Sequence, residues 1–163
     1  MDIEQIVELD KNNMSAILKK LSLPFNAELR KKGLEKDIKD GAKFITIERN
    51  NKIIAYIEYI INEDNICNIK SIQIHSKYQS SYVLGDMLVK SYMELQNNCP
   101  SYIYSFVHKN NKAALTLYLK LGFQNIDEVN ERINFKISGK ELLKNIKFMT
   151  DSISNQNVDS DMI

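Results

Sequence analysis

The chain has 163 residues, of which 44% are hydrophobic and 26% charged, the balance of a globular protein with a substantial core. Its formal net charge of +1 excludes the broad basic field of a nucleic-acid-binding surface, and no apolar run reaches the length of a membrane span. The acidic amino terminus is unlike a secretion signal, and Cys67 and Cys99 lack metal-ligand spacing. These features favour a cytoplasmic protein with reduced cysteines and no metal.

The first part of the chain is predicted to form one strand and two helices. Residues 2–9 are compatible with a strand, and residues 12–21 have the apolar spacing of an amphipathic helix. Pro24 ends that helix. Residues 26–40 form a second helix that stops at Gly41, and its dense charge pattern is typical of a solvated face.

The apolar period then changes to two residues, which is typical of strands. Residues 44–49 and 53–61 are rich in β-branched and aromatic side chains, and Asn50-Asn51 between them predicts a tight hairpin turn. Residues 66–75 form a third strand. The middle of the chain is therefore predicted to be a three-stranded antiparallel meander.

Helical and strand-like spacing alternate in the rest of the chain. Residues 82–96 have the spacing of a helix, and residues 101–107 that of a strand. Further along, strands are predicted at 123–129 and 131–138, an amphipathic helix at 139–149 and a polar tail at 150–163.

The most specific stretch is Asn-Lys-Ala-Ala-Leu-Thr-Leu-Tyr-Leu-Lys-Leu-Gly-Phe, residues 111–123. Asn111 is a preferred helix-start residue, and Gly122 stands where a left-handed cap is wanted. Ala114 and Tyr118 lie one turn apart and share a face. The spacing predicts a short, well-capped helix that carries a carboxamide and a phenol on the same side.

With this motif and this order of elements, residues 1–138 resemble the GNAT superfamily of acetyl-CoA-dependent N-acetyltransferases. The motif fits the family pattern N-x-x-A-x-x-x-Y-x-x-x-G-F at every marked position. The resemblance implies an α+β fold, with a mixed, mostly antiparallel sheet of about seven strands flanked by helices. We expect a single domain over residues 1–149, with the helix at 139–149 as an addition to the family core.

The resemblance also implies how acetyl-CoA is held at its thiol end. Asn111 would bond the pantetheine arm, and Tyr118 would protonate the departing thiolate. A thiol has a pKa of about 8.5 and tyrosine one of about 10, so a phenol is suited to that task. Backbone amides of the strand that contains Ile72 and Ile74 would bind the pantetheine and stabilise the oxyanion.

The resemblance further implies a pyrophosphate loop with the pattern Q/R-x-x-G-x-G/A. Gln79 matches its first residue, and an alignment without a gap puts Tyr82 and Leu84 at the positions of the small residues. One inserted residue instead brings Gly85 to the second glycine. At least one glycine is lost either way, so the loop is degenerate. The expected cofactor contacts here are Gln79, Ser80, Ser81, Tyr82, Val83, Leu84 and Gly85.

Two functions remain open from the sequence. The first is direct transfer of an acetyl group from acetyl-CoA to a primary amine, with Glu58 as the candidate general base. Glu58 is a lone charge in an apolar and aromatic strand, although alternation also allows a solvated face; His75 and His108 are weaker candidates. The alternative is a GNAT-fold binding or regulatory module without transferase activity. A homodimer through the added helix is compatible with both.

Overall fold

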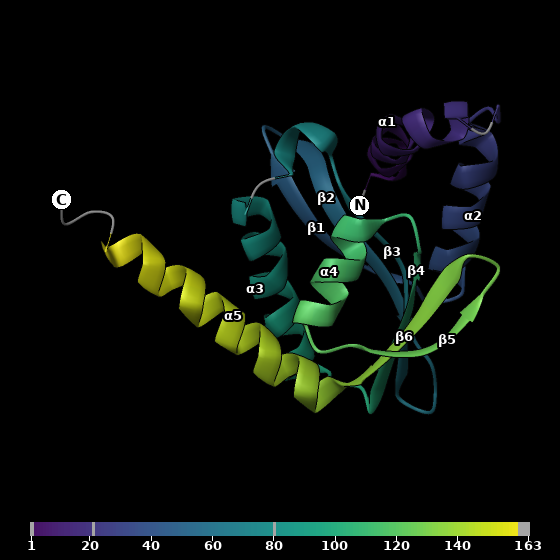
Figure 1. Cartoon of the computed structure of the whole chain (residues 1–163). Helices are drawn as coiled ribbons and strands as arrows, with labels where there is room; N and C mark the ends of the chain where they lie inside the picture. Colours follow the sequence, from purple (N-terminus) through teal and green to yellow (C-terminus); the bar gives the residue numbers. More distant parts are fainter. Residues whose placement is uncertain (1, 21, 80, 160–163) are drawn as a thin grey trace. The chain divides into compact units, whose positions relative to one another are not determined.

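The computed structural model describes residues 2–20, 22–79 and 81–159 (Figure 1). In these residues the fold is α+β, with five α-helices and a mixed sheet of six strands in the order β1-β2-β3-β4-β6-β5. The chain divides into two compact units. The first unit comprises Met1–Ile60 and Lys70–Met87, and the second comprises Ile61–Ile69 and Leu88–Ile163.

Helix α1 (Ile3–Lys20) opens the first unit, so the strand predicted at residues 2–9 is wrong. The Asp2 carboxylate accepts hydrogen bonds from the backbone N–H groups of Glu4 and Gln5, at 3.1 and 3.3 Å, and from the Gln5 side-chain amide at 3.1 Å. This cap by Asp2 starts a helix rather than a strand. The described sheet consequently has six strands instead of about seven.

Helix α2 (Ala27–Lys39) confirms the second predicted helix. The Asn26 side chain caps it by accepting a hydrogen bond from the Leu29 N–H at 2.9 Å, and Gly41 follows its end with φ of +94°. Both helices pack against the sheet through one apolar cluster. The buried members of that cluster are Ile6, Val7, Leu9, Leu34, Ile53 and Tyr56.

Strands β1 (Lys43–Arg49) and β2 (Lys52–Ile61) form the predicted antiparallel hairpin. Asn50 and Asn51 both have positive φ, at 51° and 60°, as a two-residue turn of this kind requires. Strand β3 (Ile66–Ile74) follows and passes from the second unit into the first.

A short 3-10 turn (Ser76–Tyr78) leads from β3 to helix α3 (Ser81–Asn97). The start of α3 belongs to the first unit. Val83 and Met87 are fully or almost fully buried there in a second apolar cluster with residues of β1 and β2. Val83 therefore anchors the first turn of α3 to the core.

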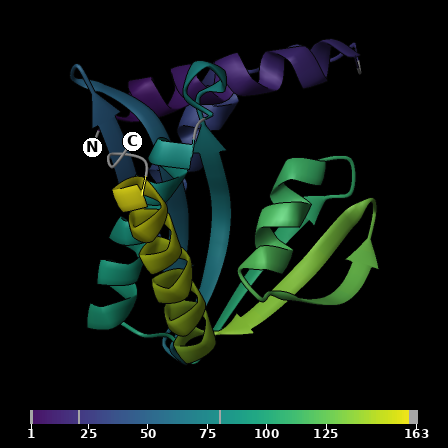
Figure 2. The ribbon, with the colours of Figure 1, turned by 60° about the vertical axis from the view of Figure 1, so that its left-hand side comes forward.

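The second unit is built on strand β4 (Tyr102–His108), which pairs antiparallel with β6 (Arg132–Ser138). Strand β5 (Gln124–Val129) pairs with the other side of β6. Helix α4 (Lys112–Lys120) covers one face of these three strands (Figure 2). Parallel pairing of β4 with β3 joins Ile66–Asn68 to the first three residues of β4 and makes the sheet mixed.

Helix α5 (Gly139–Asp159) continues from the end of β6 (Figure 1). The added helix is thus present, but it runs to Asp159 rather than to residue 149. The segment predicted to be a polar tail is helical through Asp159, and residues 160–163 lie outside the described residues. No helix of the described residues has the length and apolar character needed to cross a membrane.

Candidate active site

The predicted motif helix is α4, and both of its caps are confirmed. The Asn111 side-chain oxygen accepts a hydrogen bond from the Ala114 N–H at 3.1 Å. At the other end Gly122 has φ of +86°, its N–H bonds the Leu119 carbonyl, and the Phe123 N–H bonds the Tyr118 carbonyl, each at 3.0 Å. This paired ending satisfies the last carbonyls and fixes the direction in which the chain leaves the helix.

Tyr118 points from α4 into the core of the second unit and is 5% exposed. Its hydroxyl lies 2.7 Å from the hydroxyl of Ser105 on β4. Its ring packs on Phe123 and Phe135, with centroids 4.7 and 5.3 Å away. Burial raises the pKa of Tyr118 to about 12, so the phenol keeps its proton at neutral pH. The site thus holds one fixed, protonated phenol that is hydrogen-bonded to Ser105.

The added helix α5 takes part in holding α4. The Asn145 side-chain amide donates a hydrogen bond to the Leu121 carbonyl at 2.9 Å. A Cβ placed on Gly122 would press on that same amide nitrogen, and the Asn145 side chain would have to shift. Gly122 is therefore required chiefly by its positive φ.

The cofactor loop predicted in the first unit joins β3 to α3. Ile72 and Ile74 are half-buried on β3, beyond the residues of this strand that pair with β4. The Gln79 side-chain amide lies 3.5 Å from the Ile74 carbonyl. Ser80 and the side chain of Ser81 lie outside the described part of the structure.

The first turn of α3 carries the residues that replace glycine in the family pattern. Tyr82 is exposed, Val83 is buried and Leu84 is half-buried. Among Gln79 and residues 81–85, none has a positive φ. Tyr82 and Leu84 consequently adopt this backbone without strain, and the first N–H groups of α3 have no acceptor within the helix.

Gly85 lies inside α3 and not in the loop before it. A Cβ added to Gly85 would meet no atom within 4 Å. This placement favours the alignment without a gap, in which Leu84 stands at the position of the second glycine. Gly85 therefore contributes helical backbone only.

Replacing Gly85 with alanine is expected to raise the free energy of unfolding by about 0.5–1 kcal/mol, because alanine loses less backbone entropy in a helix. Urea unfolding measures this change. Gly122→Ala is the matched control and is expected to destabilise, given its positive φ and the contact with Asn145. A destabilised Gly85→Ala variant would contradict the helical role of Gly85.

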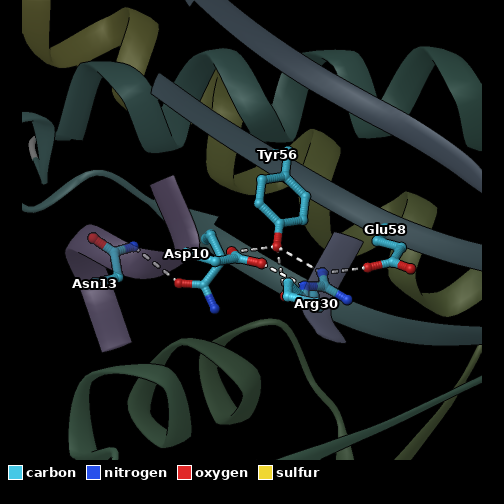
Figure 3. A network of polar contacts seen from close by, with 7 residues as sticks. Asp10, Asn13, Arg30, Tyr56 and Glu58 are labelled. Atoms are coloured by element: carbon cyan, nitrogen blue, oxygen red, sulfur yellow. Dashed lines mark hydrogen bonds and ion pairs between the residues drawn. The ribbon is translucent and has the colours of Figure 1, made fainter. Parts of the chain in front are cut away.

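Glu58, the candidate base, belongs to a buried polar network on one face of β2 (Figure 3). It is 1% exposed, so the alternative of a solvated face is wrong. Arg30 donates hydrogen bonds from Nη2 to Glu58 Oε2 at 2.9 Å and from Nε to Asp10 at 2.6 Å. The Tyr56 hydroxyl donates to Asp10 at 2.6 Å and accepts from Arg30 at 3.2 Å. One guanidinium thus bridges two buried carboxylates.

Electrostatics of this network make Glu58 more basic than an ordinary carboxylate. Burial raises the pKa of Glu58; Arg30 opposes this increase, and the nearby Asp37 carboxylate adds to it. Burial disfavours the charge of Arg30, but its bonds to Asp10 and Glu58 raise its pKa overall. Glu58 Oε1 is buried and has no hydrogen-bond partner within the described residues. Glu58 therefore keeps one oxygen that can accept a proton.

Each of the two histidines accepts a hydrogen bond from a backbone N–H group two residues further along the chain. His75 Nδ1 accepts a hydrogen bond from the Lys77 N–H at 3.1 Å. His108 is exposed, its Nδ1 accepts from the Asn110 N–H at 3.3 Å, and its Nε2 lies 3.6 Å from Glu131. His75 therefore has one ring nitrogen engaged in local structure and His108 has both, which fits their place as weaker candidates.

The predicted residues thus fall into two ordered groups. Asn111 and Tyr118 lie in the second unit, and the first unit holds Glu58, Ile72, Ile74 and the described part of the loop from Gln79 to Gly85. Sequence reasoning missed Ser105, Asp10 and Arg30. It assigned Arg30 to a solvated helix face, whereas the structure turns this side chain onto β2.

Comparison with known proteins identifies a family. A family model described as the acetyltransferase (GNAT) family matches residues 11–123. Among curated proteins, none has a sequence that matches this chain significantly.

Solved structures share the fold. The PaiA N-acetyltransferase from Thermoplasma acidophilum, in complex with coenzyme A, superposes with a TM-score of 0.66 at 16% identity, covering 84% of this chain and 92% of that one. The ribosomal-protein-S18-alanine N-acetyltransferase from Escherichia coli gives 0.66 at 15% identity, with coverage of 84% and 87%. The N-acetyltransferase PseH from Campylobacter jejuni, in complex with acetyl coenzyme A, gives 0.56 at 18%, with coverage of 82% and 90%.

Proposed function

The chain belongs to the GNAT family of acetyltransferases, and we propose that it transfers an acetyl group from acetyl-CoA to a primary amine by direct attack. The observation that carries this proposal is the capped helix α4, which holds the Tyr118 phenol in a protonated, hydrogen-bonded state. The Ser105 hydroxyl satisfies the buried Tyr118 hydroxyl and fixes the position of the phenolic oxygen.

The residues around the loop fit the cofactor despite the lost glycines. Acetyl-CoA would supply an activated thioester carrying the acetyl group. Asn111 would bond the pantetheine through its amide N–H₂, since its oxygen is used in the cap. Backbone groups of Ile72 and Ile74 would do the same along β3. The N–H groups of Gln79 and of the first turn of α3 would face the pyrophosphate, because a helix amino terminus favours anions.

Tyr118 would act as the general acid. Burial raises the pKa of Tyr118, so its phenol is protonated at neutral pH. Contacts with Phe123 and Phe135 fix the Tyr118 ring. The hydroxyl is therefore already in position, and no conformational entropy is lost in placing it during the reaction. The proton on Tyr118 Oη would stabilise the charge that develops on the leaving sulfur.

Glu58 would take the proton of the attacking amine. A base must be ionised to work, and a raised pKa makes the carboxylate a better acceptor near neutral pH. Arg30 holds Oε2, which leaves Oε1 for the proton.

Glu58→Gln is expected to lower kcat by about 10²-fold or more at neutral pH and to remove the acidic limb of the pH–rate profile. Glutamine still accepts the Arg30 hydrogen bond, so the fold is retained. Steady-state rates over a pH series with a panel of primary amines measure this. Glu28→Gln, on the exposed pair with Lys32, is the control. An unchanged profile in Glu58→Gln would remove Glu58 from the mechanism.

The proposal as a whole is tested by titrating the full chain with acetyl-CoA in a calorimeter and then assaying thiol release with the amine panel. We expect binding in the micromolar range and amine-dependent release of CoA. Absence of binding at millimolar acetyl-CoA would contradict the proposal and leave a GNAT-fold module without transferase activity.

We also propose that the protein works in the cytoplasm, because Cys67 and Cys99 are both free thiols. Burial raises the pKa of Cys67 to about 12, which keeps this thiol protonated and unreactive. A homodimer through α5 stays a prediction.

A further inference from the structure

Ser105 is an exception within its strand. The inward positions of β4 are otherwise apolar, with Ile103 and Val107 both buried, and Ser105 between them is 8% exposed. In the described residues the buried polar or charged side chains are Asp10, Glu58 and Ser105. Burying a hydroxyl lowers stability unless the hydroxyl is hydrogen-bonded. The partner that the structure provides is Tyr118, at 2.7 Å.

We propose that Ser105 is a positioning residue for Tyr118, an inference that rests on the acetyltransferase function proposed above. Two hydroxyls that share one hydrogen bond use only one of their two protons. When Ser105 donates to Tyr118 Oη, the phenolic proton is free to point at a second acceptor. When Tyr118 donates instead, that proton is already used. Ser105 as donor is therefore the arrangement that lets Tyr118 serve as an acid.

Of the two hydroxyl groups, the packing leaves that of Ser105 as the one that can reorient. Phe123 and Phe135 flank the ring of Tyr118, and Ser105 lies directly opposite Phe135 in the β4–β6 pairing. The serine hydroxyl turns about a single bond and can redirect its proton without moving the chain. Ser105 can thus follow a change in the hydrogen bonding of Tyr118 while the ring stays in place.

A hydrogen bond donated to Tyr118 Oη has a defined effect on the proton transfer. As the carbon–sulfur bond breaks, its electron pair goes to sulfur, and the proton of Tyr118 Oη moves toward that sulfur. Negative charge then grows on Tyr118 Oη, where the Ser105 hydroxyl stabilises it. The attacking amine loses one proton to the base, which releases it to solvent, and Tyr118 takes one proton back from solvent, so protons balance over the cycle.

The test is the pKa of the thiol of bound CoA, which reports on Tyr118 without any turnover. Thiolate absorbance of the CoA complex is titrated with pH, and the desulfo-CoA complex serves as the blank. In the wild-type protein we expect a thiol pKa below that of free CoA. Ser105→Ala is expected to reduce the thiolate fraction at a given pH about tenfold. Ser105→Cys keeps the side-chain size but donates a weak hydrogen bond, so it is expected to behave like Ser105→Ala. Ser105→Thr keeps the hydroxyl and is expected to keep the wild-type thiol pKa.

Controls separate the two proposals. Ser101→Ala, exposed just before β4, is expected to leave the thiol pKa unchanged. A wild-type chain that does not bind CoA would overturn the proposed function and this inference with it. CoA binding with the same thiol pKa in wild type, Ser105→Ala and Ser105→Cys would overturn the role of Ser105 alone. If Ser105→Ala does not fold, the cysteine variant decides.

Discussion

Tyr118→Phe is expected to lower kcat by about 10²- to 10⁴-fold, the range for loss of a general acid, while acetyl-CoA affinity stays near the wild-type value. The ring contacts with Phe123 and Phe135 survive this change, so only the hydroxyl and its bond to Ser105 are lost. An interaction that matters only as charge develops on sulfur acts on kcat rather than on binding. Stopped-flow measurement of CoA release under saturating acetyl-CoA gives the rate.

Tyr104→Phe is the matched control for that experiment. Tyr104 is next to Ser105 on β4 but points to the opposite face, where Lys136 lies 5.4 Å from its ring. Its loss of a hydroxyl is expected to change kcat less than twofold. Equal rates for Tyr118→Phe and wild type would contradict the general-acid role. Because Tyr118→Phe leaves the buried Ser105 hydroxyl unpaired, at a cost of about 1–3 kcal/mol, rates are compared below the unfolding range of both variants.

The motif helix could be predicted from sequence because its determinants are local. Asn111 and Gly122 fix the two ends of α4 through backbone contacts a few residues away, and the structure reproduces both caps. The hairpin turn at Asn50-Asn51 is local in the same sense. Such features depend on residue type and spacing alone.

The amino-terminal helix was missed although a local signal was present. Asp2 and Gln5 have the spacing of a capping box, and in the structure the Asp2 carboxylate caps the helix by accepting from the N–H groups of Glu4 and Gln5. The apolar pattern of a run as short as residues 3–9 fits both the 3.6-residue period of a helix and the two-residue period of a strand. Only the capping residues distinguish the two structures.

Side chains that meet across distant segments lie beyond such reasoning. Arg30 and Glu58 are far apart in the sequence, and nothing in the charged stretch around Arg30 indicates which cation turns inward. Ser105 resembles any small polar strand residue until α4 brings Tyr118 against it. Which polar groups become partners is decided by tertiary packing, which a one-dimensional pattern does not contain.

Arg30→Met is expected to lower the free energy of unfolding by about 3 kcal/mol at neutral pH, because it leaves the carboxylates of Asp10 and Glu58 buried without their shared cation. The value is at the lower end for a buried ion pair, since the Arg30 side chain is itself 24% exposed. Methionine retains most of the alkyl volume, so loss of packing contributes little. Urea unfolding followed by circular dichroism measures the change.

The loss is expected to depend on pH. The folded-state pKa of Glu58 lies above its ordinary value of 4.5, so the stability that it contributes is present below that value and is lost as pH rises through the folded pKa. Arg30 is one of the groups that lower this pKa. Without it the pKa rises further, and ionising Glu58 destabilises the fold more. The difference between Arg30→Met and wild type should therefore be smallest in acid and grow as pH rises.

Two further variants separate charge from structure. Lys32→Met removes a cation from the same helix, where Lys32 and Glu28 are 68% and 78% exposed, and is expected to change stability by no more than about 0.5 kcal/mol. Adding Glu58→Gln to Arg30→Met removes one uncompensated charge and should recover part of the lost stability at neutral pH. An Arg30→Met deficit that is independent of pH, or that Glu58→Gln does not reduce, would show that Arg30 acts through packing and not as the cation that lets β2 bury a carboxylate.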